Sequence, residues 1–97
     1  MSTDTLTKTT QDTSQPPQFR VLLLNDDYTP MDFVVFILRR YFRKTETEAI
    51  QVMQEAHEKG LATAGVYSFE LAETKVSQVL RDSRREGHPL RCEIAPT

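Results

Sequence analysis

The stretch VLLLNDDYTPMDFVV, residues 21–35, contains the point at which an apolar segment gives way to a polar turn and then to a helix start. With the two preceding residues it forms FRVLLL, a short apolar run of the kind that is typical of a buried strand. Thr29, Pro30 and Asp32 then supply a capping side chain, a proline for the first helical position and an acid for the first turn. We therefore expect a strand, a turn and a helix over about residues 30–43.

Two more helices are predicted by their end signals. Thr45 and Glu48 form a capping-box pattern, and Gly60 stands where a left-handed residue commonly closes a helix. Ser68 can cap a third helix, which Gly87 is expected to end.

Two short segments predict the remaining strands, LATAGVYSF at 61–69 and HPLRCEI at 88–94. In the first segment, Gly65 indicates a bulge or a close approach of another stretch of backbone. Strands this short are not stable alone. The expected fold class is α+β: a small three-stranded, mostly antiparallel sheet covered on one face by three helices, in the order βααβαβ.

The beginning of the chain differs from the rest in composition. MSTDTLTKTTQDTSQPPQ is rich in Thr, Ser, Gln and Asp, and such a segment buries too little apolar area to offset the entropy of ordering it. We expect a disordered tail over residues 1–18 and a single folded domain over residues 19–97.

Charge and hydropathy argue against several function classes. Twelve basic and fourteen acidic residues give a formal net charge of −2, which does not favour a nucleic-acid surface or a polybasic membrane patch. No apolar run approaches the ~20 residues that span a bilayer, and no signal region is recognisable. With one cysteine there is no internal disulfide. We expect a cytoplasmic protein.

The turn contains three neighbouring side chains that accept hydrogen bonds, Asn25, Asp26 and Asp27. A turn between a strand and a helix needs about one such side chain. A turn that bonds its own amides and a helix start that favours acids would explain them, and a bound ligand would explain them too. His57 lies four residues after Met53, so it is expected to share the apolar face of its helix instead of pointing at water. A core-edge histidine bonded to a backbone group is the alternative.

The residue types indicate binding more than catalysis. No Ser or Thr stands in a nucleophile elbow, and Cys92 is expected to be buried. Asp26, Asp27 and His57 lack the spacing of a calcium loop and the second His or Cys of a zinc site, so no metal and no cofactor are expected. An amide, a carboxylate and a neutral imidazole would instead satisfy the three N–H donors of an α-ammonium group. The side chain of the residue that carries this α-ammonium group would enter a hollow between two helices.

Four segments together resemble the ClpS adaptor family: NDDYTPMDFVV at 25–35, residues 53–57, GVYSFELAETKV at 65–76 and HPLRC at 88–92. The resemblance covers about residues 19–95 in one collinear order. It implies an adaptor, not an enzyme, that binds proteins with a free, large hydrophobic N-terminal residue (Leu, Phe, Tyr or Trp), known as an N-degron. It also implies delivery of these proteins to ClpA, the AAA+ unfoldase of the ClpAP protease, by a cytoplasmic monomer that binds neither nucleic acid nor membrane.

The resemblance also implies roles for individual residues. Asn25, Asp26 and His57 would bind the substrate α-amino group, while Asp27 and Thr29 would line the rim and bond the first peptide groups. The hydrophobic pocket would consist of Met31, Val34, Ile37, Met53, Ala56 and Leu90. Within it Met31 would exclude β-branched side chains, Ile37 would form the floor, and Ala56 stands where family members often carry a larger aliphatic residue.

A second surface is implied for the unfoldase. Glu70 and Lys75 match the family's contact positions for the N-terminal domain of ClpA, although by themselves they are ordinary solvated charges. Residues 1–18 resemble the family's unfoldase-modulating extension only in being polar. The rival hypothesis is a ribosome-associated or nucleic-acid-binding module, since small α+β domains of this shape occur in the translation machinery, and the charge balance argues against it.

Overall fold

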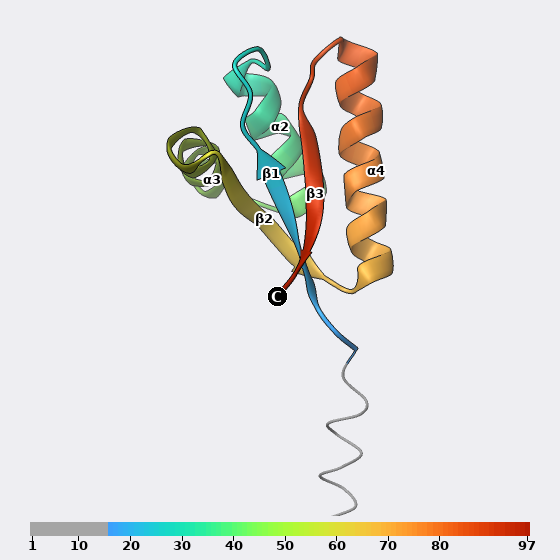
Figure 1. The fold of residues 1–97 in the computed structure, drawn as a ribbon. Coiled ribbons are helices and arrows are strands. Elements are labelled where there is room, and N and C mark those ends of the chain that lie inside the picture. Colours follow the sequence, from blue (N-terminus) through green and yellow to red (C-terminus); the bar gives the residue numbers. More distant parts are fainter. Residues whose placement is uncertain (1–15) are drawn as a thin grey trace, which may run out of the picture.

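The protein, represented by a computed structural model, is described over residues 16–97. Its elements follow the predicted order βααβαβ and confirm the α+β class (Figure 1). They are β1 (Phe19–Leu24), α2 (Met31–Phe42), α3 (Glu46–Lys59), β2 (Leu61–Tyr67), α4 (Phe69–Glu86) and β3 (Arg91–Pro96). Most of the tail predicted over residues 1–18 lies outside the described residues, so the tail remains a prediction.

The three strands form one antiparallel sheet in the order β2-β1-β3. Figure 1 looks at the strands from the open face of the sheet, with α2 behind them and α3 and α4 at the two sides. Val21 and Leu23 of the central strand point to the helices and are fully buried, because β1 has a paired strand on each side and helices above it. The core therefore lies between this face of the sheet and the three helices.

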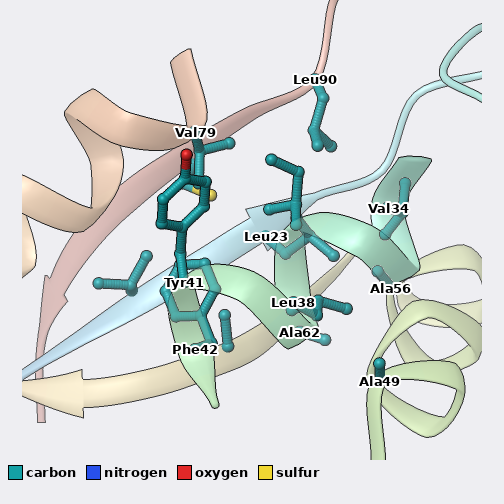
Figure 2. Packing of buried hydrophobic residues seen from close by; sticks show 14 of the residues in the cluster. Leu23, Val34, Leu38, Tyr41, Phe42, Ala49, Ala56, Ala62, Val79 and Leu90 are labelled. Atoms are coloured by element: carbon teal, nitrogen blue, oxygen red, sulfur yellow. The ribbon is translucent and has the colours of Figure 1, made fainter. Parts of the chain in front are cut away.

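Figure 2 shows how the helices fill this core. Leu38 of α2 and Val79 of α4 are fully buried, and Phe42 and Tyr41 close the far end of α2. Each such side chain contributes roughly 1.5–3 kcal/mol when it leaves water. Within the described residues, no helix is long and apolar enough to cross a membrane.

The predicted helix ends at α3 and α4 are confirmed. Thr45 accepts from the Glu48 amide (3.1 Å) while Glu48 accepts from the Thr45 amide (2.9 Å), which is a complete capping box. Ser68 accepts from an amide in the first turn of α4. Gly60 and Gly87 end the two helices with φ of 91° and 77°, a conformation that costs glycine little.

The end signals of α2 and β3 were predicted less well. The first helix, Met31–Phe42, agrees with the predicted range within one residue at each end, but Pro30 is its N-cap, without a side-chain bond, and not its first helical residue. Thr29 is not the cap, because its hydroxyl donates to Asp26 instead. The last strand runs over Arg91–Pro96, so residues 88–90 form a connection and not a strand.

Gly65 lies at a bulge, as expected, and the group that approaches it closely is a side chain and not a backbone. The β1–β2 register shifts between Val21, which faces Gly65, and Leu22, which faces Thr63, so one extra residue of β2 forms a bulge. The ring of Tyr67 packs where a Cβ of residue 65 would stand. Any larger residue there would displace this ring.

A buried polar cluster joins α2 to α4. The Tyr41 hydroxyl donates to Asp82 (2.6 Å), whose side chain is 3% exposed. Arg81 and Arg85 also donate to the Asp82 carboxylate, at 3.2 and 2.9 Å. The Tyr41 hydrogen bond, together with the two arginines, outweighs burial and lowers the pKa of the Asp82 carboxyl below its ordinary 3.8. The only strongly buried charge in the described core is thus fully paired.

Candidate functional site

A cavity of about 550 Å³ opens where the end of β1, the first turn of α2 and the second half of α3 meet. This volume is in the range of roughly 300–1,000 Å³ that ligand sites occupy. Its lining residues are Leu23, Leu24, Asn25, Asp26, Asp27, Thr29, Met31, Val34, Met53, Gln54, Ala56, His57, Glu58 and Leu90. The cavity has an apolar part and a polar part. The apolar part is formed by side chains of β1, α2, α3 and the segment before β3, and the polar part by the turn after β1 and by α3.

The structure brings together five of the six residues predicted for the hydrophobic pocket. Val34 and Ala56 lie next to each other where α2 meets α3, with Leu90 close by (Figure 2). Ala56 is buried and Val34 is 8% exposed, whereas Met31 is 68% exposed at the mouth. The sixth residue, Ile37, does not line the cavity and is fully buried in the core.

All five residues predicted for the polar part line the cavity. The Asp26 carboxylate, however, is already hydrogen-bonded to other residues of its own turn. Its carboxylate accepts from the amides of Tyr28 (2.8 Å) and Thr29 (2.7 Å) and from the Thr29 hydroxyl (2.8 Å). Partial burial raises the pKa of the Asp26 carboxyl, but these bonds and the nearby His88 outweigh it and hold the pKa below 3.8. Of about four lone-pair sites on a carboxylate, roughly one remains for a ligand.

The bonding of Asp26 explains why the turn carries so many acceptors. Asp26 is needed to fold the turn, whereas Asn25 and Asp27 are exposed. The backbone N–H of Asn25 donates to the Gly60 carbonyl (3.0 Å), which fixes the turn against the end of α3. The acceptor-rich turn is thereby held beside His57.

His57 lines the cavity but is exposed, so the expectation that it would turn away from water is wrong. The helix packs on the core through Ala49 and Ala56, which are buried, and His57 lies at the edge of that contact. An exposed imidazole at a cavity mouth is available to a ligand.

Four lining residues were not predicted: Leu23, Leu24, Gln54 and Glu58. Gln54 and Glu58 are four residues apart, so they stand on one side of α3 next to His57. This spacing was available in the sequence, but two polar residues on an exposed helix face are ordinary. Only the cavity shows that they form a wall.

Glu70 and Lys75 lie on α4 and do not line this cavity. Glu70 is exposed in the first turn of the helix. The Lys75 ammonium stands over the ring of Tyr67, 5.6 Å from its centroid, and Lys75 is half-buried.

The sequence also raised the questions of a metal site and of a reactive thiol. In the described part of the chain, no group of three or more His, Cys, Asp or Glu side chains is placed to hold a metal ion. Burial raises the pKa of the Cys92 thiol to about 12, which keeps it protonated and unreactive.

The fold and the cavity together define a small α+β binding domain whose site suits an amphipathic cation: apolar walls, acceptors at the mouth and, in the described residues, no Lys or Arg in the lining. Residues 14–93 match the family model described as ATP-dependent Clp protease adaptor protein ClpS. The chain belongs to this ClpS family of adaptor proteins.

Individual relatives agree with this assignment. The chain is 55% identical to the ATP-dependent Clp protease adapter protein ClpS of Ruegeria sp. (strain TM1040), over 92% of this chain and 79% of the relative. It is also 55% identical to the protein of that name from Deinococcus radiodurans, over 97% of this chain and 81% of the relative. The solved structure of Agrobacterium tumefaciens ClpS2 bound to L-phenylalaninamide matches with a TM-score of 0.82 and 37% identity, over 86% of this chain and 100% of that one.

Proposed function

We propose that this adaptor binds proteins that begin with a free, large hydrophobic residue (Leu, Phe, Tyr or Trp) and delivers them to the ClpA unfoldase of the ClpAP protease. It acts as a cytoplasmic monomer and is not itself an enzyme. The cavity carries the proposal, since it joins an apolar hollow to a rim of acceptors. The bound molecule of the ClpS2 relative, L-phenylalaninamide, combines a free α-amine with an aromatic side chain.

The amine is held at the rim in this proposal. Asn25 and His57 each offer one acceptor, and Asp26 offers its remaining lone pair and its charge. Asp27 and Thr29 bond the first peptide groups of the substrate. An acetylated N-terminus has neither the charge nor the donors, and it would leave these acceptors unpaired.

The side chain enters the apolar part between Val34, Met53, Ala56 and Leu90. Burying a Leu or Phe side chain is worth roughly 1.5–3 kcal/mol, and each charge-assisted hydrogen bond is worth about as much. Binding in the micromolar range follows after the cost of association. Met31 covers the mouth and opposes side chains that branch at Cβ.

Delivery uses a separate surface in this proposal. Glu70 and Lys75 of α4 contact the N-terminal domain of ClpA. Because neither residue lines the cavity, substrate and unfoldase can be bound at the same time.

The test is degradation of a folded reporter that begins with Phe, by purified ClpA and ClpP with and without this protein. We expect the protein to accelerate degradation, and the Glu70→Ala variant to lose this effect while it still binds a Phe peptide. Glu73→Ala, an exposed acid one turn further along α4, is the matched control. Equal acceleration by both variants would place the docking surface elsewhere.

A further inference from the structure

The bulge of β2 decides which side chains at the end of this strand face the helices. In a regular strand the side chains alternate, so Ala62 and Ala64, which are both buried, would be followed on the helix side by Val66. The extra residue of the bulge shifts this alternation by one position. Val66 is accordingly 47% exposed, and Tyr67 packs against the core instead.

Gly65 and Phe42 fix where the Tyr67 ring can lie. A Cβ on residue 65 would stand 2.6 Å from Cε2 of this ring, which is well inside van der Waals contact, so the ring occupies space that only a glycine leaves free. The Phe42 ring of α2 lies 6.3 Å from the Tyr67 ring, centroid to centroid, within the range of aromatic pairs. The ring is therefore held by β2 and α2 in a place that does not depend on α4.

A cation of α4 lies against this ring. The Lys75 ammonium is 5.6 Å from the ring centroid, within the limit of about 6 Å for cation–π attraction. Among the described residues, no carboxylate forms an ion pair with Lys75. Because a lysine stem is flexible, the position of this ammonium depends on what attracts it. The Tyr67 ring is the group that does so here.

We infer that Tyr67 positions Lys75 for its contact with the N-terminal domain of ClpA. This inference rests on the proposed function, because it requires Lys75 to dock the unfoldase. A lysine that samples many rotamers must be ordered when it docks, and that ordering costs affinity. The Tyr67 ring restricts Lys75 before the unfoldase is bound. Tyr67 therefore acts through Lys75 and need not contact the unfoldase itself.

The experiment titrates the labelled full chain with purified ClpA. Tyr67→Leu removes the ring and should weaken binding about 2- to 5-fold, because the ring holds Lys75 by no more than a cation–π contact near the surface. Tyr67→Phe keeps the ring face and should bind like the wild type. Gly65→Ala adds a Cβ that displaces the ring and should weaken binding as Tyr67→Leu does. Equal binding by Tyr67→Leu and Tyr67→Phe would overturn the inference.

A double-mutant cycle distinguishes positioning from a general loss of structure. If Tyr67 acts through Lys75, Tyr67→Leu should have little effect on binding in a chain that already carries Lys75→Gln, because the ammonium is gone. A purely structural role of the ring would weaken binding by the same factor with and without Lys75→Gln. That result would contradict the inference.

Two further results separate failure of the inference from failure of the proposed function. If Lys75→Gln binds ClpA as tightly as the wild type, Lys75 does not dock the unfoldase, so that part of the proposed function fails and the inference fails with it. If Lys75→Gln weakens binding but Tyr67→Leu does not, the proposed function stands and the inference does not. In NMR spectra of the free chain, the ring should shift the ε-methylene protons of Lys75 upfield in the wild type and in Tyr67→Phe but not in Tyr67→Leu. Absence of this shift in the wild type would overturn the inference alone.

Discussion

Replacing Tyr41 by Phe removes one hydroxyl from the cluster that joins α2 to α4. This hydroxyl donates to Asp82 at 2.6 Å and accepts from Arg81 at 3.0 Å. A hydrogen bond to a charged group contributes about 1.5–3 kcal/mol. Asp82 keeps its bonds from Arg81 and Arg85, so the loss should fall near the lower end, about 1.5–2 kcal/mol. For a chain of this size that is a fall in Tm of roughly 6–16 °C.

Thermal and urea unfolding followed by circular dichroism measure this loss directly. Tyr28→Phe is the matched control, because Tyr28 is 82% exposed and its hydroxyl lies in water. That variant should stay within about 0.5 kcal/mol of the wild type. A Tyr41→Phe variant that is equally close to the wild type would refute the assignment of the cluster as the junction between the two helices.

The same cluster gives the stability difference a pH dependence. Because the pKa of Asp82 is lowered in the folded chain, its ionised form stabilises the fold above the ordinary value of 3.8. That contribution disappears as the pH falls through the lowered pKa. The difference in the free energy of unfolding between wild type and Tyr41→Phe should have its full value near pH 7 and should shrink below pH 3.8. A gap that widened in acid would contradict the role given to Tyr41.

Three further predictions concern the cavity and the thiol. Met31→Ala should extend binding to peptides that begin with Val or Ile with little change in stability, since Met31 is 68% exposed; unchanged discrimination in a peptide-binding titration would remove Met31 from the role of gate. His57→Ala should weaken the binding of a Phe peptide, because the amine loses one hydrogen-bond acceptor at the rim; an unchanged affinity in the same titration would argue against His57 as an acceptor. Cys92 should resist iodoacetamide in the folded protein at pH 8 and react after unfolding in urea, because burial raises its pKa to about 12; equal rates measured by mass spectrometry would show that the strand does not protect it.

Local signals in the sequence predicted most of the fold. Thr45 and Glu48 identify the start of α3 because both partners of the capping box lie within one turn of helix. The start of α2 was less predictable, since Thr29 can either cap a helix or donate to Asp26. In the structure Thr29 donates to Asp26, whose carboxylate accepts hydrogen bonds from two backbone amides and one hydroxyl.

The environment of the site depends on contacts between distant parts of the chain. Helical periodicity placed His57 on the side of Met53, but it could not show that this edge of α3 is open to water. The pairing of Tyr41 with Asp82 joins residues 41 positions apart, and no periodicity encodes it. That Gln54 and Glu58 of α3 share one wall of the cavity is likewise visible only in the structure.

Fluorescence anisotropy with three peptides tests the central claim most directly: one that begins with a free Phe, its acetylated form and one that begins with Val. The account predicts saturable binding of the free Phe peptide in the micromolar range or below, and at least tenfold weaker binding of the other two. Equal binding of all three would contradict it, because a cavity that ignores the amine and the shape of the first side chain is not a site for N-terminal residues.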